Sequence, residues 1–122
     1  MRKINTFDID GVIYMGEDRT GVRPHSSDVI ITGRSYTQKE ETINFLRARE
    51  IWNDVHFNPL TRDDPKYSRQ ESGKWKAKVL TLLKEKYIID LHFEDDPIQI
   101  AEILRVHPDQ DIVHLQHNLV EK

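Results

Sequence analysis

The stretch Ile4-Asn5-Thr6-Phe7-Asp8-Ile9-Asp10-Gly11-Val12 decides the fold of this chain. An apolar run begins almost at the first residue and ends in two aspartates. A buried strand over residues 4–7 would carry Asp8 and Asp10 to its carboxyl end, where Gly11 lets the chain turn. Because Asp8 and Asp10 are two positions apart, they point to the same side of an extended chain. Two carboxylates held this close attract a divalent cation, or divide the roles of nucleophile and general acid.

Length and composition restrict the class of protein. The 122 residues suit one domain with one core, residues 1–122. The 18 Lys and Arg against 21 Asp and Glu leave a net charge of −3, so the broad basic surface of a general nucleic-acid binder is not expected. The absence of cysteine excludes disulfides, thiolate catalysis and Cys-ligated zinc. No apolar segment is long enough to cross a bilayer, and residues 1–5 do not open a signal peptide, so we expect a cytoplasmic protein without a membrane partner.

Apolar runs and amphipathic segments alternate along the chain. Further strands are expected at residues 28–32, 55–57, 88–93 and 112–115, and helices at 36–50, 74–86 and 97–106. The turn-rich segment 12–27 could hold a short hairpin, and the polar segment 59–72 is expected to be a loop. This alternation predicts an α/β fold, a three-layer sandwich around a Rossmann-like parallel sheet of about five strands.

Polar residues gather at the ends of three of these strands. In an open parallel sheet the site lies beyond the carboxyl ends of the strands, so segments far apart in the sequence would meet there. The three clusters are Asp8 with Asp10, Thr32-Gly33-Arg34, and Glu94-Asp95-Asp96.

These residues resemble the haloacid dehalogenase superfamily of phosphohydrolases. Four motifs occur in the family's order over nearly the whole chain: Asp8-Ile9-Asp10-Gly11, a strand ending at Thr32, a lysine near the start of a helix within residues 73–78, and a strand ending in the acids 94–96. The resemblance implies a magnesium-dependent phosphomonoesterase that works through an aspartyl-phosphate intermediate.

The roles carried over follow the motifs. Asp8 would be the nucleophile, and Asp10 the acid that protonates the leaving oxygen and then activates water. Thr32 would hydrogen-bond the phosphoryl oxygens, with Gly33 and Arg34 also binding substrate. Because family members that act on carbon–halogen bonds lack an acid at the position of Asp10, its presence points to phosphoryl chemistry.

The lysine and the metal ligands have more than one candidate. Lys76 is favoured for the lysine that offsets the charge beside Asp8, with Lys74 second and Lys78 as a further alternative. Mg²⁺ would bind the Asp8 carboxylate, the Asp10 backbone carbonyl and an acid of the fourth motif. Asp95 is favoured there, with Asp96 or Glu94 in support; if the strand ends one residue earlier, Glu94 replaces it.

Neither interval between the motifs can hold a cap domain, so the chain resembles the capless members with open sites. An open site suits a large substrate such as a nucleic-acid end or a phosphoprotein, or it could be closed by a second subunit of a homo-oligomer. Within the superfamily the chain is loosely similar to the phosphatase domain of polynucleotide kinases, and nucleotidases share parts of the pattern. Arg34, Arg62 and Arg69 are candidate phosphate-backbone contacts.

Two other functions share features with this sequence. A receiver-type signalling domain has similar length and architecture, but its phosphoacceptor aspartate ends the third strand, where this chain has His56-Phe57-Asn58. A catalytically silent binding or regulatory protein would keep the fold without turnover, and the intact acid pair argues against it. His114 and His117 have no third metal ligand nearby and are interpreted as structural, in a C-terminal end expected to fray.

Overall fold

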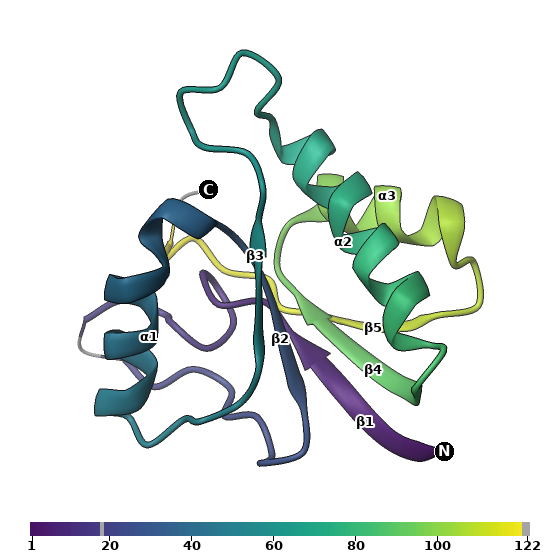
Figure 1. Ribbon diagram of the computed structural model, residues 1–122, viewed down its shortest axis with the longest axis horizontal. Coiled ribbons are helices and arrows are strands. Elements are labelled where there is room, and N and C mark those ends of the chain that lie inside the picture. Colours follow the sequence, from purple (N-terminus) through teal and green to yellow (C-terminus); the bar gives the residue numbers. More distant parts are fainter. Residues whose placement is uncertain (18, 121–122) are drawn as a thin grey trace.

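The protein is built on one parallel sheet. The computed structural model describes residues 1–17 and 19–120, and in them five strands pair in the order β3-β2-β1-β4-β5. The strands are β1 (Arg2–Phe7), β2 (Val29–Ser35), β3 (Val55–Asn58), β4 (Tyr87–Glu94) and β5 (Asp111–His114). The helices are η1 (Tyr36–Gln38, a 3₁₀ helix), α1 (Lys39–Ala48), α2 (Arg69–Leu83) and α3 (Pro97–Val106). Figure 1 shows how they connect the strands, and the predicted α/β fold is confirmed.

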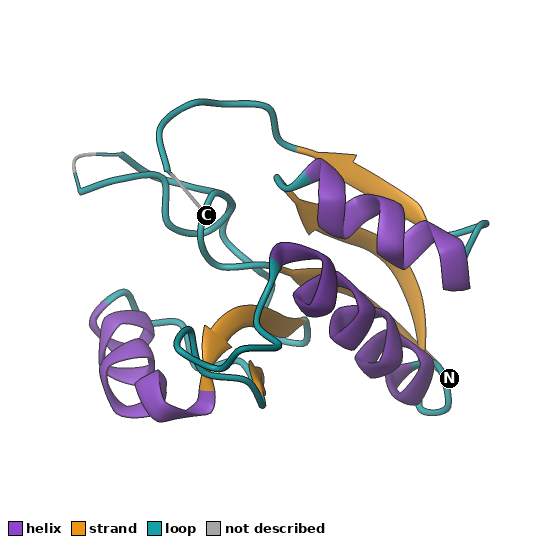
Figure 2. Ribbon diagram, turned by 90° about the horizontal axis from the view of Figure 1, so that it is seen from above, coloured by secondary structure: helices purple, strands orange, loops and turns teal. Residues whose placement is uncertain are grey.

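Both faces of the sheet are covered by helices. Alternate strand residues point to opposite faces, so neighbouring residues of one strand pack against different helices. Ile31 of β2 belongs to one buried cluster with Leu80 of α2 and Ile103 of α3. Its neighbour Ile30 belongs to a second cluster with Leu46 near the end of α1. Figure 2 shows α1 on the opposite side of the molecule from the α2–α3 pair. The result is the expected three-layer sandwich.

The strand order has a switch point between β1 and β4. From β1 the chain adds β2 and β3 on one side, and then β4 and β5 on the other. This is the order 3-2-1-4-5 of the doubly wound dinucleotide-binding folds, whereas receiver domains have the order 2-1-3-4-5. The receiver alternative is therefore wrong on topology. The carboxyl ends of β1 and β4 flank the crevice where such sheets bind ligands.

Helix α2 begins five residues earlier than expected. The Ser68 side chain accepts a hydrogen bond from the Glu71 backbone N–H at 2.9 Å and caps the helix, so the prediction of a loop through Ser72 is wrong in its last four residues. In the sequence Gly73 suggests a break before the helix, but in the structure Gly73 lies inside α2. A Cβ at Gly73 would lie 2.8 Å from Gln99 Cα, so glycine permits the close crossing of α2 and α3.

Smaller differences concern strand and helix ends. Strand β2 continues past Thr32 to Ser35, although its pairing with β3 shifts in register between these two residues. The segment expected to hold a hairpin contains two isolated bridges, Asp10 to Tyr14 and Tyr14 to Thr20. The helix expected at 36–50 begins as η1 and continues as α1. Among the described residues, no helix has the length and apolar character needed to span a membrane.

Candidate active site

Three carboxylates meet at the switch point of the sheet. Asp8 follows the last residue of β1, Glu94 ends β4, and Asp95 comes next. The pairing of Phe7 with Phe93 and a 3.1 Å hydrogen bond from the Asp8 N–H to the Phe93 carbonyl hold the two strand ends together. One oxygen of each carboxylate lies within 4.8 Å of the others. This cluster of acids could bind a metal ion.

Lys76 is the lysine that reaches this cluster. Its Nζ lies 2.7 Å from Glu94 Oε1 and 3.2 Å from Asp8 Oδ1, and its side chain is fully buried. Lys74, the second candidate, is half exposed on the same helix and pairs with Glu71 at 3.3 Å. Lys78 is exposed. The geometry thus brings Lys76, and neither of its alternatives, to the carboxylates.

Two further acids at this edge are each held by an arginine. Arg34 donates two hydrogen bonds to Asp10, at 2.9 and 2.8 Å, and Arg69 donates two to Asp96, at 2.8 and 2.6 Å. The hydrogen bond to Asp10 is the main reason that the pKa of Arg34 is raised. Burial alone would raise the pKa of Asp96, but the hydrogen bonds from Arg69 and the Ile98 N–H outweigh it and lower that pKa.

The charges at the centre leave a negative excess. Among the described residues at this edge, the two arginines pair with Asp10 and Asp96, and the Lys76 ammonium pairs with Asp8 and Glu94, whereas Asp95 lies against His117. With neutral histidines, three carboxylates and one ammonium give a formal excess of two negative charges. A divalent cation would neutralise this excess, and carboxylate oxygens are ligands that Mg²⁺ prefers. The donor set therefore fits a divalent cation that takes oxygen ligands.

Asp10 is not a member of the three-carboxylate cluster and pairs with Arg34. The chain leaves the strand after Phe7 and turns, with the Val12 and Tyr14 N–H groups both donating to the Ile9 carbonyl. The carboxylate of Asp10 consequently lies against Arg34 of β2, with a quarter of its side chain exposed. The Asp8 carboxylate also contributes to the raised pKa of Arg34, so both carboxylates lie near one guanidinium. That the two side chains point to one side of the chain stays a prediction.

Thr32 and Gly33 lie on β2 beside this arrangement. Thr32 is fully buried, and its Oγ1 accepts a hydrogen bond from the Arg34 N–H at 3.0 Å. The Gly33 carbonyl accepts a hydrogen bond of 3.4 Å from Asn58, whose amide also donates to Ser72 at 3.0 Å. These bonds tie β2 to β3 and α2 at the carboxyl edge of the sheet.

A buried row of hydrogen bonds extends from the cluster into the sheet. His92 Nε2 lies 3.4 Å from Glu94 Oε1, and its Nδ1 is hydrogen-bonded at 2.7 Å to Thr6 Oγ1. Sequence reasoning missed both residues. For His92 the spacing carried the signal, because His92 and Glu94 are two apart on β4 and share one face of that strand, and Thr6 is the residue of β1 that pairs with His92.

His117 also lies at the site, although it was interpreted as structural. Its Nε2 is 2.9 Å from Asp95 Oδ2, and both side chains are nearly buried. The segment after β5 was expected to fray, but up to Val120 it folds back over the strand ends, with the Leu115 N–H donating to the Glu94 carbonyl at 2.9 Å. No periodicity marks this contact, because it depends on the path of the chain after the last strand.

Comparison with known proteins supports the fold. No protein-family model and no curated protein sequence matches the chain. It is similar to a chain in a solved structure of a Pnkp1/Rnl/Hen1 complex, with a TM-score of 0.68, 16% identity, and coverage of 97% of this chain and 46% of that chain. It is also similar to a chain of the Pnkp1/Rnl/Hen1 RNA repair complex, with a TM-score of 0.68, 18% identity, and coverage of 97% and 43%. This chain spans less than half the length of those chains.

Proposed function

We propose that this protein is a magnesium-dependent phosphomonoesterase that acts through an aspartyl-phosphate on Asp8. The observation that carries the proposal is the meeting of Asp8, Lys76 and the two acids Glu94 and Asp95, at the end of β4, at the switch point of the sheet. The motifs shared with the haloacid dehalogenase superfamily support it. Asp8, Glu94 and Asp95 are the side chains that would hold Mg²⁺, together with the Asp10 carbonyl that the resemblance implies; the bound ion would offset the charge of the phosphate.

The first step transfers the phosphoryl group to the protein. A carboxylate oxygen of Asp8 attacks phosphorus, the bond from phosphorus to the leaving oxygen breaks, and a proton from Asp10 goes to that oxygen. Lys76 orients Asp8 and provides positive charge beside the reacting group. In the second step water attacks the phosphorus of the aspartyl-phosphate, Asp10 takes the proton of the water, and inorganic phosphate leaves as Asp8 is regenerated.

In this mechanism Arg34 would bind both the Asp10 carboxylate and the substrate phosphate. In the structure it holds the Asp10 carboxylate with two hydrogen bonds. A protonated Asp10 has less acceptor capacity, so it does not keep both bonds. We therefore expect Arg34 to move at least one hydrogen bond to the phosphate when substrate binds, while Thr32 and the Gly33 backbone support the other phosphoryl oxygens.

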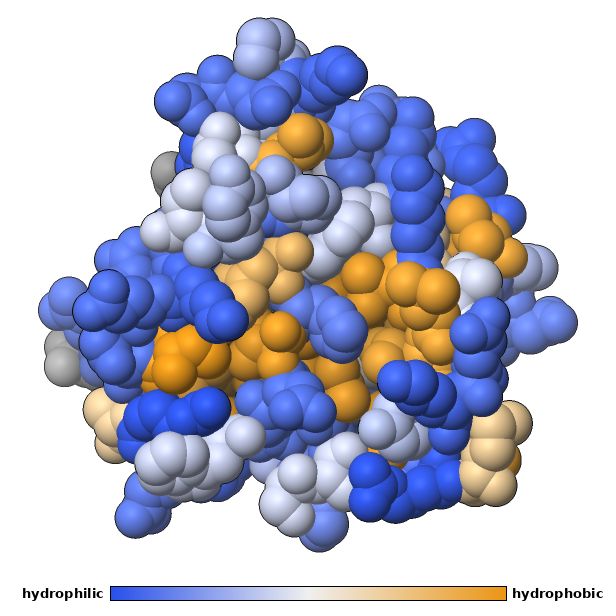
Figure 3. Space-filling model, in the orientation of Figure 1, coloured by the Kyte–Doolittle hydropathy of each residue, from blue (hydrophilic) through white to orange (hydrophobic). Residues whose placement is uncertain are grey.

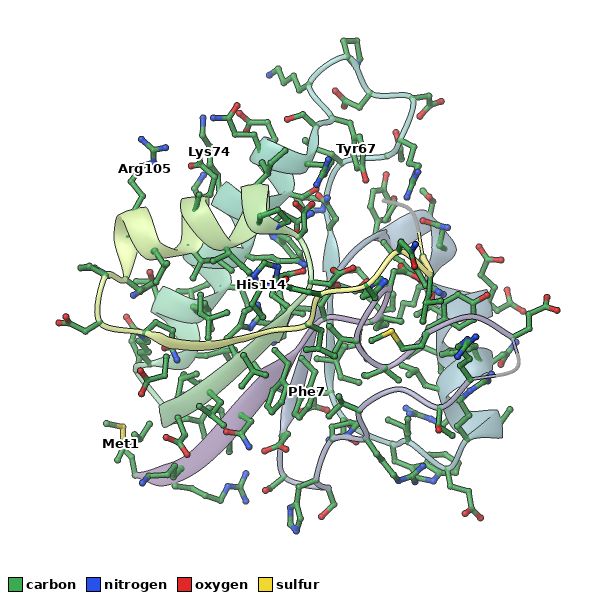
Figure 4. The ribbon with its side chains drawn as sticks, turned by 180° about the vertical axis from the view of Figure 1, so that it is seen from behind. Met1, Phe7, Tyr67, Lys74, Arg105 and His114 are labelled. Carbon is green, nitrogen blue, oxygen red and sulfur yellow. The ribbon has the colours of Figure 1, made fainter. Side chains whose placement is uncertain are left out.

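The substrate class we propose is a phosphate at a nucleotide or polynucleotide end. The similar structures include chains of an RNA repair complex, and the site is not covered by a cap in the described residues. The loop between β3 and α2 rises beyond the carboxyl ends of the strands, and most of its surface is hydrophilic (Figures 1 and 3). Arg62 on this loop lies over the ring of Tyr67, 5.8 Å from its centroid (Figure 4 labels Tyr67), and such a cation and ring are the groups on which single-stranded nucleic acids stack.

Phosphate release tests the proposal. The substrates would be p-nitrophenyl phosphate, mononucleotides and oligonucleotides with 3′ or 5′ phosphates, each with and without Mg²⁺. We expect Mg²⁺-dependent release that Asp8→Asn abolishes and that Asp90→Asn, which changes an exposed aspartate of β4, retains. The best substrate would separate a nucleotidase from an end-processing enzyme. No release from any substrate by folded protein would favour the silent binding protein instead.

A further inference from the structure

We propose that His117 is a positioning residue for the metal site, because its ring holds the Asp95 carboxylate in the orientation needed to bind the ion. This inference rests on the proposed function. It assigns a role to the segment after β5, which none of the four motifs includes.

The hydrogen bonds define which nitrogen of His117 donates. The Leu119 N–H donates to His117 Nδ1 at 3.1 Å, so this nitrogen is an acceptor and carries no proton. The proton of the neutral ring is then on Nε2, which donates to Asp95 Oδ2 at 2.9 Å. Only 9% of the His117 side chain and 5% of the Asp95 side chain are exposed, so water has little access to compete for this bond.

Backbone contacts bring the segment to this position. The Leu115 N–H donates to the Glu94 carbonyl, and the His114 ring donates from Nε2 to the Asp95 carbonyl at 3.2 Å. Figures 1 and 4 show the chain running from the end of β5, where His114 is labelled, across the strand ends toward the side of α1. The segment is therefore anchored to the end of β4 two and three residues before His117.

Gly11 confines the pair from a third direction. Its φ is +87°, and a Cβ added there would overlap the Asp95 carboxylate and lie 2.7 Å from His117 Nε2. The turn after β1, the end of β4 and the segment after β5 thus enclose one carboxylate. A carboxylate held in this way loses less conformational freedom when it binds a cation. Partners that orient a ligand in this manner typically change metal affinity 10- to 100-fold, which sets the expected size of the effect at about that range.

The experiment measures metal affinity directly. Mn²⁺ serves as the probe, because it takes the same oxygen ligands as Mg²⁺ and its free form is read by electron paramagnetic resonance. We expect His117→Leu to bind Mn²⁺ about 10- to 100-fold more weakly than the unsubstituted protein. His117→Gln places an amide donor near the position of Nε2, so it should recover most of the affinity. His25→Leu, which changes an exposed histidine bonded to Ser27, is the matched control.

The outcomes separate this inference from the function on which it rests. Affinity of His117→Leu equal to that of the control overturns the role of His117, and so does a His117→Gln protein that binds as weakly as His117→Leu. Absence of Mn²⁺ binding in the unsubstituted protein overturns the metal-dependent function itself. His117→Ala, which adds no apolar bulk, takes the place of His117→Leu if thermal unfolding without metal shows that the leucine variant is not folded.

Discussion

Replacing Lys76 with methionine removes the one ammonium that lies against the three-carboxylate cluster in the part of the chain that the structure describes. The side chain is fully buried, with Nζ at 2.7 Å from Glu94 and 3.2 Å from Asp8. Methionine fills a similar volume but leaves two buried carboxylates facing each other without this cation. Removing one partner of a buried ion pair typically costs about 3–5 kcal/mol, which is a large share of the roughly 5–15 kcal/mol stability of a domain. At about 4 °C per kcal/mol for a chain of this length, the melting temperature would fall by about 12–20 °C.

The response to Mg²⁺ should differ as well. The formal excess at the centre grows from two to three negative charges when Lys76 is lost, so a bound cation relieves more repulsion in the variant than in the unsubstituted protein. Urea unfolding with Mg²⁺ and with a chelator measures both effects. Adding Asp8→Asn to Lys76→Met removes one of the repelling carboxylates and should return part of the lost stability in the chelator.

The control is Lys74→Met on the same helix. Its ion pair with Glu71 is about half exposed, so the expected loss is at most about 0.5 kcal/mol. A loss of stability in Lys76→Met no larger than that in Lys74→Met would contradict the role given to the Lys76 ammonium. Further destabilisation of the Lys76→Met protein by Asp8→Asn would contradict it too, because the buried carboxylates would then not be repelling each other.

Three further changes have defined outcomes. Gly73→Ala should lower the free energy of unfolding by about 1–3 kcal/mol despite the better helix propensity of alanine, because its Cβ meets the backbone of α3. An unchanged urea midpoint would mean that the two helices separate at little cost. Asp96 has a lowered pKa when folded, so the stability from its contact with Arg69 is present above its unfolded pKa of about 3.9 and is lost as the pH falls through the folded pKa. Arg69→Met should therefore flatten the acid side of the stability profile below about pH 4, by a modest amount because Arg69 is partly exposed; an unaltered profile would contradict this. Arg34→Lys keeps the charge but loses the paired contact with Asp10, so it should reduce kcat for phosphate release by about 10-fold or more. Full kcat in Arg34→Lys would show that a single cation is sufficient at this position.

Much of the fold was predictable because local patterns agree with the tertiary structure. The apolar runs before Asp8, Thr32 and Glu94 are strands in the structure, and their alternation with amphipathic segments predicted the parallel sheet. The start of α2 was missed although Ser68 and Glu71 have the spacing of a capping box. Gly73 and Lys74 suggested a boundary instead. The role of Gly73 becomes visible only when α3 is placed against it.

The candidate site was likewise predictable from the sequence only in part. Asp8, Lys76 and Asp95 were expected at one place, and the structure brings them together with Glu94. For Asp10 the structure adds its partner Arg34, which the spacing of Asp8 and Asp10 does not indicate.

The sequence by itself determined the order of strands and helices and which strand ends carry acids. Both properties follow from local features of the sequence. The hydrophobic periodicity of a segment and the residues that directly follow it depend on only a few neighbouring positions. Only the tertiary structure decided which acid pairs with which cation. The contacts of Lys76 with Glu94 and of Arg34 with Asp10 span 18 and 24 positions, and that of His117 with Asp95 spans 22. Such pairs depend on strand order, helix crossing and the path of the chain after β5, and charge alone does not distinguish one carboxylate from another.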